Sequence, residues 1–347
     1  MTSTGSLKNH QYAHIVDLAA YLPEQTLSNE ELAALYPEWP AEKILAKTGI
    51  RSRHVAAPGQ TASDMACEAA RALFAQGAVR PDDIDFIILC TQAPDHFLPT
   101  SACILQERLG IRRSAGALDI NLGCSGFVYG LSLAKGLIET GVAQRVLLLT
   151  ADTYSRLIHP MDKSVRTLFG DAAVATLVAA GEADNECIGP FVFGTDGSGA
   201  KNLIVEAGAF RQPCTAQTAV ETTDASGNVR TSEHLYMNGA EVFSFTLKEV
   251  PLAVSNLLDK AGLIRDDIDF FVLHQANRFM LDALRKKLAI APEKMPICIE
   301  NVGNTVSSTI PLTLIQMRNE GKIVSGTRLM LVGFGVGYSW AAALINF

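Results

Sequence analysis

The sequence predicts a layered α/β protein made of two similar halves. Three segments recur in unchanged order at an offset of about 180 residues, a pattern that chance rarely produces. Short runs of β-branched and aliphatic residues also alternate with helical patterns, as in βαβ units with buried strands. Together they predict five layers, αβαβα, with the halves related by a pseudo-twofold axis. The matched segments are 82–89 with 266–273, 121–124 with 301–304, and 145–149 with 328–332.

The halves are expected to divide at residue 181, giving domains 1–181 and 182–347. Segment 22–54 has a helical pattern and basic residues, and we interpret it as an insertion that shapes the entrance of a site. Segment 181–230 is rich in Gly, Thr, Asp and Pro and predicts a connector with a surface hairpin. The expected elements are strands at 14–18, 86–89, 116–121, 146–149, 173–178 and 270–273, and helices starting at Ser101, Ser125 and Phe279.

Composition narrows the class of protein. The chain has 347 residues, of which 48% are apolar and 19% charged, enough for a large core. No run has the length of a membrane span and segment 1–9 is polar, so we expect a cytoplasmic protein without a membrane partner. Seven cysteines without metal-type spacing fit a reducing compartment and no metal site. The formal net charge of −7 argues against nucleic acid as a partner.

Cys124 is the candidate nucleophile. It follows the expected strand at 116–121 and precedes an apolar helical run, with Gly123 and Gly126 beside it. Backbone N–H groups and the positive end of the helix dipole favour a thiolate at such a place. The small neighbours permit a tight turn and close approach of a substrate. We interpret the other six cysteines as packing residues.

Two polar residues of the second half are expected to face Cys124. His274 directly follows the strand at 270–273, where it can act as a base. Asn304 matches Cys124 in the repeat and can donate its amide N–H to a carbonyl or enolate oxygen. The glycine-rich turn at 333–337 lacks a dinucleotide-binding context, so it predicts either an oxyanion hole or a hairpin corner.

These residues carry a resemblance to a known family. The sequences LDINLGCSGF around Cys124, HQAN from His274 and GNT around Asn304 resemble the β-ketoacyl-acyl-carrier-protein synthase III family of the thiolase superfamily. The match covers nearly the whole chain, including 48–54, 169–171 and 333–337. Segments 193–199 and 235–239 are similar to a subgroup found beside surface-polysaccharide and lipopolysaccharide genes.

The resemblance implies a thiolase-like fold and a homodimeric enzyme without a cofactor. It implies that Cys124 takes an acyl group from a coenzyme A or phosphopantetheine thioester, with the N–H groups of Cys124 and Val336 holding the oxyanion. His274 and Asn304 would then stabilise the enolate from malonyl-acyl-carrier protein, which attacks the acyl-cysteine. The partner is acyl-carrier protein, which is acidic.

The chain departs from the family pattern at the entrance and at the acyl pocket. Lys43 replaces a tryptophan that stacks on adenine in many relatives, and Lys47 and Lys163 replace arginines. Leu98 stands at a gate that is often Phe and is contributed across the dimer. Val336 replaces a glycine, which narrows the backbone conformations open to the turn. We expect carrier protein to be favoured over coenzyme A, bound by a basic surface comprising Lys43, Lys47, Lys163, Arg278, Arg285, Lys286 and Lys287.

Three alternatives stay open at this point. An acyltransferase of the same fold could pass the acyl group to an alcohol or amine without condensation, although retention of His274 and Asn304 favours condensation. A papain-type cysteine hydrolase also uses Cys, His and Asn in this chain order, but has no twofold repeat. A catalytically silent binding subunit is disfavoured by the presence of all three residues.

Overall fold

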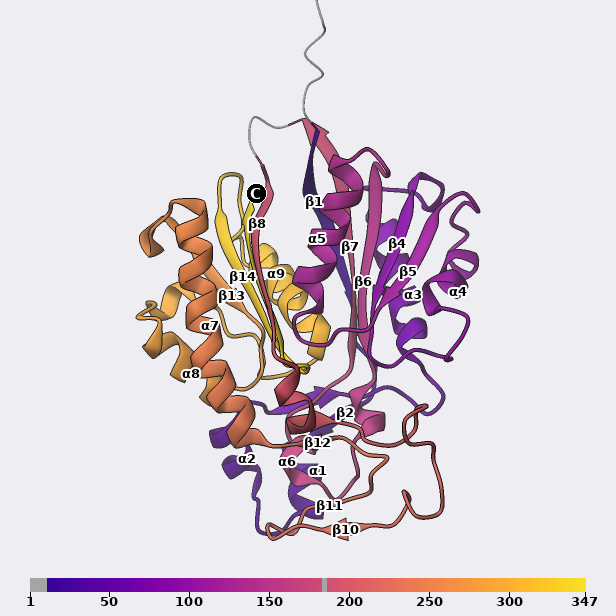
Figure 1. Cartoon of the computed structure of the whole chain (residues 1–347), viewed down its shortest axis with the longest axis vertical. Helices are drawn as coiled ribbons and strands as arrows, with labels where there is room; N and C mark the ends of the chain where they lie inside the picture. Colours follow the sequence, from indigo (N-terminus) through magenta and orange to yellow (C-terminus); the bar gives the residue numbers. More distant parts are fainter. Residues whose placement is uncertain (1–10, 183–185) are drawn as a thin grey trace, which may run out of the picture.

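A computed structural model of the chain describes residues 11–182 and 186–347. Two sheets stand side by side in Figure 1, one formed in the first half of the chain and one in the second. The predicted segment 1–9 lies outside the described residues. None of the described helices is long and apolar enough to cross a membrane.

The first sheet has five strands in the order β1-β7-β6-β4-β5. Strands β4, β5 and β6 run parallel, whereas β7 is antiparallel to both β6 and β1. The strands are β1 Gln11–Tyr21, β4 Phe86–Cys90, β5 Gly116–Ile120, β6 Arg145–Asp152 and β7 Ala172–Glu182.

The second sheet has four strands in the order β13-β14-β15-β8. Strands β13 and β14 run parallel, and β15 is antiparallel to both β14 and β8. Each sheet thus pairs a parallel centre with antiparallel strands toward one edge, which is the internal similarity that the repeated segments predict. The strands are β8 Ile188–Thr195, β13 Phe270–Leu273, β14 Arg328–Gly335 and β15 Ser339–Asn346.

Helices complete the five layers. In Figure 1, α3 and α4 cover the outer face of the first sheet, α5 and α9 lie between the sheets, and α7 and α8 cover the outer face of the second. Three large apolar cores fill the spaces between these layers. The helices are α1 Asn29–Leu35, α2 Ala41–Thr48, α3 Ala62–Ala75, α4 Ser101–Arg108, α5 Gly126–Glu139, α6 Lys163–Arg166, α7 Gly239–Ala261, α8 Arg278–Lys287 and α9 Thr309–Asn319.

The prediction for segment 181–230 is partly wrong. This segment contributes β8, which forms the edge of the second sheet as β1 forms the edge of the first. Sequence reasoning missed the strand because its alternation is interrupted by Gly189, Pro190 and Gly194. The predicted surface hairpin is confirmed, as β10 Thr222–Thr223 pairs with β11 Val229–Arg230. Two further short pairs join β2 Thr26–Ser28 to β3 Ser52–His54 and β9 Leu203–Ile204 to β12 Tyr236–Met237.

The insertion at 22–54 packs against the carboxyl ends of the central strands, at the lower end of Figure 1. Arg53 anchors it: this side chain is fully buried and donates to Leu27 O, Asn29 Oδ1 and Thr167 O, each at 2.9 Å. Gly170 and Gly303 lie against the Arg53 Cβ, where a side chain on either glycine would collide. Arg53 therefore fixes the backbone beside the site.

Candidate active site

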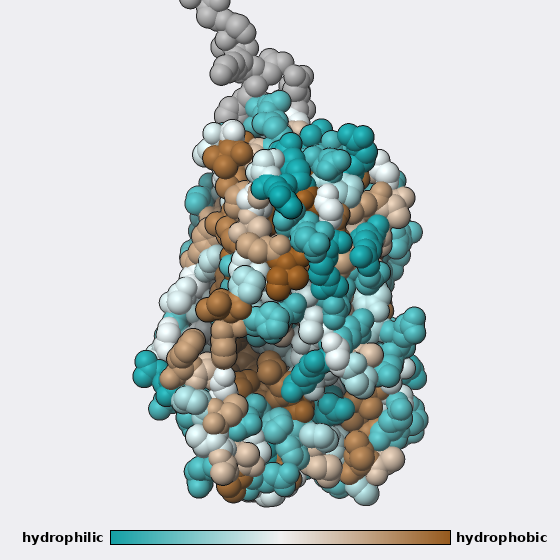
Figure 2. All heavy atoms as spheres, turned by 90° about the vertical axis from the view of Figure 1, so that its right-hand side faces the viewer, coloured by the Kyte–Doolittle hydropathy of each residue, from teal (hydrophilic) through white to brown (hydrophobic). Residues whose placement is uncertain are grey.

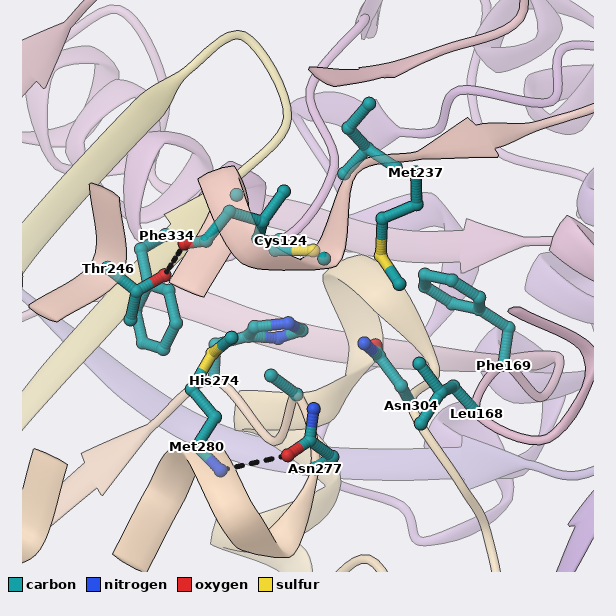
Figure 3. A pocket seen from close by; sticks show the side chains of 15 residues that line it. Cys124, Leu168, Phe169, Met237, Thr246, His274, Asn277, Met280, Asn304 and Phe334 are labelled. Carbon is teal, nitrogen blue, oxygen red and sulfur yellow. Dashed lines mark hydrogen bonds between the residues drawn. The ribbon is translucent and has the colours of Figure 1, made fainter. Parts of the chain in front are cut away.

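Cys124, His274 and Asn304 line one cavity of about 70 Å³. Cys124 follows β5 of the first half, whereas His274 follows β13 and Asn304 precedes α9 in the second half. Figure 3 shows the three side chains pointing into the same space. The structure thus brings together the three residues that the sequence nominates.

A tight backbone arrangement surrounds the thiol of Cys124. A Cβ added at Gly335 would lie 2.9 Å from Cys124 Sγ, and one added at Gly333 would lie 2.8 Å from the Cys124 carbonyl oxygen. Both glycines belong to β14, so the end of this strand must be free of side chains to pass the nucleophile. The predicted close approach of a substrate to Cys124 therefore depends on Gly333 and Gly335 of the second half as well as on Gly123.

The prediction of a resting thiolate is wrong. Cys124 is 6% exposed, and burial together with the Asp152 carboxyl raises the pKa of its thiol well above the ordinary value. Cys124 also stands two residues before the first residue of α5, with Ser125 as the N-cap. Because the helix dipole acts over one turn and burial penalises any charge, the thiol is protonated until a base takes its proton.

Asp152 is the buried carboxyl that sequence reasoning missed. It accepts from Gln92 N at 2.8 Å and from Ser307 Oγ at 2.5 Å, which joins the two halves. Burial raises the pKa of Asp152 to about 7. Asp152 is the last residue of β6, the strand that begins with the matched segment 145–149, and this position at a strand end is the signal that could have drawn attention to it.

His274 is a neutral imidazole held from two sides. Its side chain is 2% exposed, and burial lowers its pKa to about 3. Nδ1 lies 2.7 Å from Thr309 Oγ1, and the ring packs edge-on against Phe334 with centroids 5.4 Å apart. In a neutral imidazole one ring nitrogen carries a hydrogen and can donate a hydrogen bond, and the other is unprotonated and can accept a proton.

The amide of Asn304 is oriented by the next residues of its own segment. Its Oδ1 accepts from Val306 N at 3.0 Å, so the Nδ2 hydrogens are directed away from that bond. Backbone bonds to Leu168 O at 2.9 Å and from Gly170 N at 3.0 Å fix the main chain. Asn304 is therefore a preorganised hydrogen-bond donor.

The remaining wall of the cavity is mostly apolar, which suits the chain of an acyl group rather than a polar substrate. Figure 3 shows Met237, Phe169 and Leu168 on one side of the thiol and Met280 below the imidazole. Single-sequence reasoning missed these residues because ordinary core positions have the same composition. The apolar lining comprises Leu168, Phe169, Leu203, Met237, Val242, Met280 and Phe334.

Val336 and Leu98 occupy different settings. Val336 stands at the corner between β14 and β15, with Cγ1 2.9 Å from the place that a Cβ on Gly123 would take. The predicted hairpin corner is confirmed, and it lies directly against the turn that carries the nucleophile. Leu98 is 81% exposed on a surface loop, beside Phe97, whose ring contacts Phe210 at 5.3 Å.

The basic surface is not one uniform cluster. The prediction that Lys163 is available to a ligand is wrong, because its side chain is 9% exposed, 3.2 Å from Glu38, and donates to Ser226 O at 2.7 Å. The β10-β11 hairpin covers it. Lys43 and Lys47 are exposed and lie over the Trp39 ring, each 5.0 Å from the centroid.

The aromatic ring of Trp39 therefore lies next to Lys43, although residue 43 itself is not aromatic. Trp39 precedes Lys43 by four residues, a spacing that could have suggested the contact.

The basic residues of α8 are partly paired. Arg278 pairs with Asp282 at 3.1 Å, and Arg285 lies 3.7 Å from the same carboxylate. Lys286 and Lys287 are exposed. Helix α2 ends against α8, since Gly49 contacts Arg278, so these cations share one side of the molecule.

Comparisons with known proteins identify the relationship. Residues 118–197 match the family model described as 3-oxoacyl-[acyl-carrier-protein (ACP)] synthase III, and residues 258–347 match the model of its C-terminal part. The beta-ketoacyl-[acyl-carrier-protein] synthase III of Caldanaerobacter subterraneus subsp. tengcongensis is 36% identical over 337 residues, covering 96% of this chain and 97% of that protein.

Solved structures agree. A crystal structure at 2.1 Å of a 3-oxoacyl-(acyl-carrier-protein) synthase III is 68% identical, with a TM-score of 0.96 and coverage of 97% of this chain and 100% of that one. The 3-oxoacyl-(acyl-carrier protein) synthase of Burkholderia xenovorans LB400 is 37% identical, with a TM-score of 0.88 and coverage of 97% and 94%. The predicted thiolase-like layered fold is thereby confirmed, and the chain belongs to the 3-oxoacyl-acyl-carrier-protein synthase III family.

Proposed function

We propose that Cys124, His274 and Asn304 condense an acyl thioester primer with malonyl-acyl-carrier protein. The chain is a 3-oxoacyl-acyl-carrier-protein synthase III-type acyltransferase, and its product is a 3-oxoacyl-acyl-carrier protein. The observation that carries the residue assignment is the shared cavity, where a thiol of one half faces an imidazole and an amide donor of the other.

In the first stage His274 takes the proton of the Cys124 thiol, and the sulfur attacks the carbonyl carbon of the primer. The N–H groups of Cys124 and Val336 are the proposed oxyanion donors, because the hairpin corner lies against the nucleophile turn. The thioester sulfur leaves as a thiolate and receives the proton from His274. The primer is then an acyl-cysteine, with its chain against the apolar wall.

In the second stage malonyl thioester loses carbon dioxide, and the resulting enolate attacks the acyl-cysteine. Asn304 Nδ2 and His274 Nε2 are the proposed donors to the enolate oxygen. Thiol, imidazole, amide and backbone N–H groups supply every function that both stages need. We therefore propose that the enzyme works without a bound cofactor or metal.

The acyl group is proposed to arrive on acyl-carrier protein rather than on coenzyme A. Lys163 is covered and paired with Glu38, so it is unavailable to a coenzyme A phosphate. Two lysines also lie over the face of the Trp39 ring, where an adenine would have to displace them. The exposed Lys43, Lys47, Lys286 and Lys287 suit an acidic protein surface.

We also propose that two copies of the chain form the working enzyme in the cytoplasm. Figure 2, which views the side of α4 and β5, shows apolar side chains around a hollow in the lower half of this face. Strand β5 is the edge of its sheet, and Phe97, Leu98 and Phe210 expose 72%, 81% and 88% of their surface. Pairing of two copies would cover these residues and make Leu98 a gate to the partner's acyl pocket. The link to surface-polysaccharide genes stays a prediction.

Mass spectrometry of the intact protein tests the reaction. We expect incubation with acyl thioesters to add one acyl mass at Cys124, and subsequent malonyl-acyl-carrier protein to remove it with release of carbon dioxide. Loss of the acyl group to an added alcohol or amine, without carbon dioxide, would instead support the transferase without condensation. Acylation elsewhere in the chain would reject the assignment of the nucleophile.

A further inference from the structure

The segment from Asn304 to Thr309 contains a residue in a strained conformation. Val306 has φ of +55°, a region of backbone conformation that β-branched residues rarely adopt. In this conformation its N–H donates to Asn304 Oδ1 at 3.0 Å, and its carbonyl accepts from Thr309 Oγ1 at 3.1 Å. Val306 therefore contacts Asn304, which is one proposed donor, and Thr309, whose hydroxyl lies against the other, His274.

The hydroxyl of Thr309 connects this turn to the imidazole. Thr309 is 3% exposed, and its Oγ1 lies 2.7 Å from His274 Nδ1. A hydroxyl has one hydrogen, so it donates either to Val306 O or to Nδ1. When it donates to Val306 O, its lone pair faces Nδ1, which must then carry a hydrogen. Nε2 is then unprotonated, because His274 is neutral.

We propose that Thr309 is a positioning residue that keeps the His274 hydrogen on Nδ1 in the resting enzyme, so that Nε2 can accept the proton of the Cys124 thiol. This inference rests on the proposed roles of Cys124 and His274. The S–H bond breaks, an N–H bond forms at Nε2, and the imidazolium still donates through Nδ1 to Thr309. The departing thiolate of the primer takes the Nε2 proton, which restores the neutral imidazole.

The protonated thiol makes this arrangement necessary. Cys124 holds its proton in the resting state, and an imidazole with a hydrogen on Nε2 would offer it no acceptor. The same hydroxyl, rotated toward Nδ1, suits the opposite form with the hydrogen on Nε2, which the second stage needs for donation to the enolate. That form arises while the thiol is acylated, when Nε2 takes up a proton from water and Nδ1 releases its own proton to water.

Three variants separate the hydroxyl from the packing. Thr309→Val keeps the shape and removes the hydroxyl, whereas Thr309→Ser keeps the hydroxyl. Thr313→Val is the matched control, because Thr313 is also fully buried on α9 but its hydroxyl donates to the Thr309 carbonyl at 2.9 Å. We expect Thr309→Val to slow single-turnover acylation of Cys124 by about tenfold to a hundredfold. Thr309→Ser should recover most of this rate, and Thr313→Val should keep it.

The protonation of His274 is measured directly by ¹⁵N NMR of histidine-labelled enzyme, with the signal assigned by its loss in His274→Gln. We expect hydrogen on Nδ1 and a bare Nε2 in the wild type, and a shift of the hydrogen toward Nε2 in Thr309→Val. Hydrogen on Nε2 in the resting wild type would overturn the proposal. So would equal loss of rate in Thr309→Ser and Thr309→Val. The NMR result is independent of turnover, so a wild type that acylates another residue rejects the proposed function without deciding the tautomer.

Discussion

Strands β4 and β13 hold matching places in the two halves, yet they lead to side chains with different roles. Cys90 ends β4, is fully buried, and donates its thiol to Leu122 O at 3.0 Å. A Cβ on Gly126 would lie 2.2 Å from its sulfur, so Cys90 fills the space beneath the start of α5. His274 follows β13 and reaches the cavity instead. The fold determines where these side chains stand, and the residue type determines what they do.

The second matched pair differs in the same way. Cys124 and Asn304 occupy corresponding turns, and both line the cavity. The first half supplies the covalent nucleophile, Cys124. The second half supplies a proton acceptor, His274, and a hydrogen-bond donor with a fixed orientation, Asn304. Because each half lacks what the other provides, catalysis requires both, and the divergence of the halves can be tested residue by residue.

The largest expected effect separates the two cysteines of the first half. Cys124→Ala should abolish acylation and lower turnover by more than about 10⁴-fold, as removal of a nucleophile does elsewhere. Cys90→Ala should keep acylation and lose stability, because it creates a cavity in a packed core. Peptide mapping after incubation with acyl thioester measures acylation in both variants, and urea denaturation measures the stability of Cys90→Ala. An acyl group on the exposed Cys103 or Cys214 would contradict the comparison.

A smaller effect distinguishes the two companions in the second half. Asn304→Ala should lower condensation by about 10²–10³-fold and spare acylation, because its amide acts on the enolate. His274→Ala should slow both stages, since the buried thiol also needs a base. Single-turnover acylation and carbon dioxide release, measured separately, give the two rates. Condensation at a rate near that of the wild type in either variant would remove that residue from the site.

The sequence was sufficient for the layered architecture and for nominating the three residues that share the cavity, but not for the edge strand β8. Repeated segments place Cys124 and Asn304 in corresponding turns, and the strand pattern at 270–273 brings His274, the next residue, to the same edge of the sheets. The sequence could not predict the charge state of Cys124, because the pKa of the thiol depends on burial and on Asp152, a residue distant in sequence. The prediction for Lys163 was wrong for a related reason, because the β10-β11 hairpin, about 60 residues later in the chain, covers this side chain.

The halves also differ at the surface, and this offers a test of the carrier. Helix α4 follows β4 and has one basic residue in its last turn, whereas α8 follows β13 and has three. Lys286→Glu with Lys287→Glu should raise the KM for primers on acyl-carrier protein about tenfold with little change in kcat, by loss of electrostatic steering. Steady-state kinetics at low and high salt measure this effect.

Arg71→Glu with Arg80→Glu is the matched control for that variant. It changes the net charge equally, but on and beyond α3, which covers the outer face of the first sheet. We expect this control to leave the KM unchanged. Equal responses in the two double variants, or equal kcat/KM for primers on coenzyme A and on carrier protein, would contradict docking at α8.

The last comparison concerns stability rather than catalysis, at the two mirror residues Cys90 and His274. Burial lowers the pKa of His274 from 6.5 to about 3, so between these values the unfolded chain binds a proton that the folded chain does not. The free energy of unfolding from this residue therefore falls as the pH falls below about 6.5. At pH 5 the loss relative to neutral pH is about 2 kcal/mol for a shift of this size.

His274→Gln removes this contribution, so its free energy of unfolding should fall less between pH 7.5 and pH 5 than that of the wild type. Cys90→Ala should instead follow the wild-type slope, because burial raises the pKa of Cys90 and its thiol stays protonated throughout the acid range. Urea denaturation at several pH values measures the three slopes, with all other titrating groups shared. A His274→Gln slope parallel to that of the wild type would show that burial does not hold the imidazole neutral. Burial would then have no measurable effect on protonation at either mirror position in the acid range.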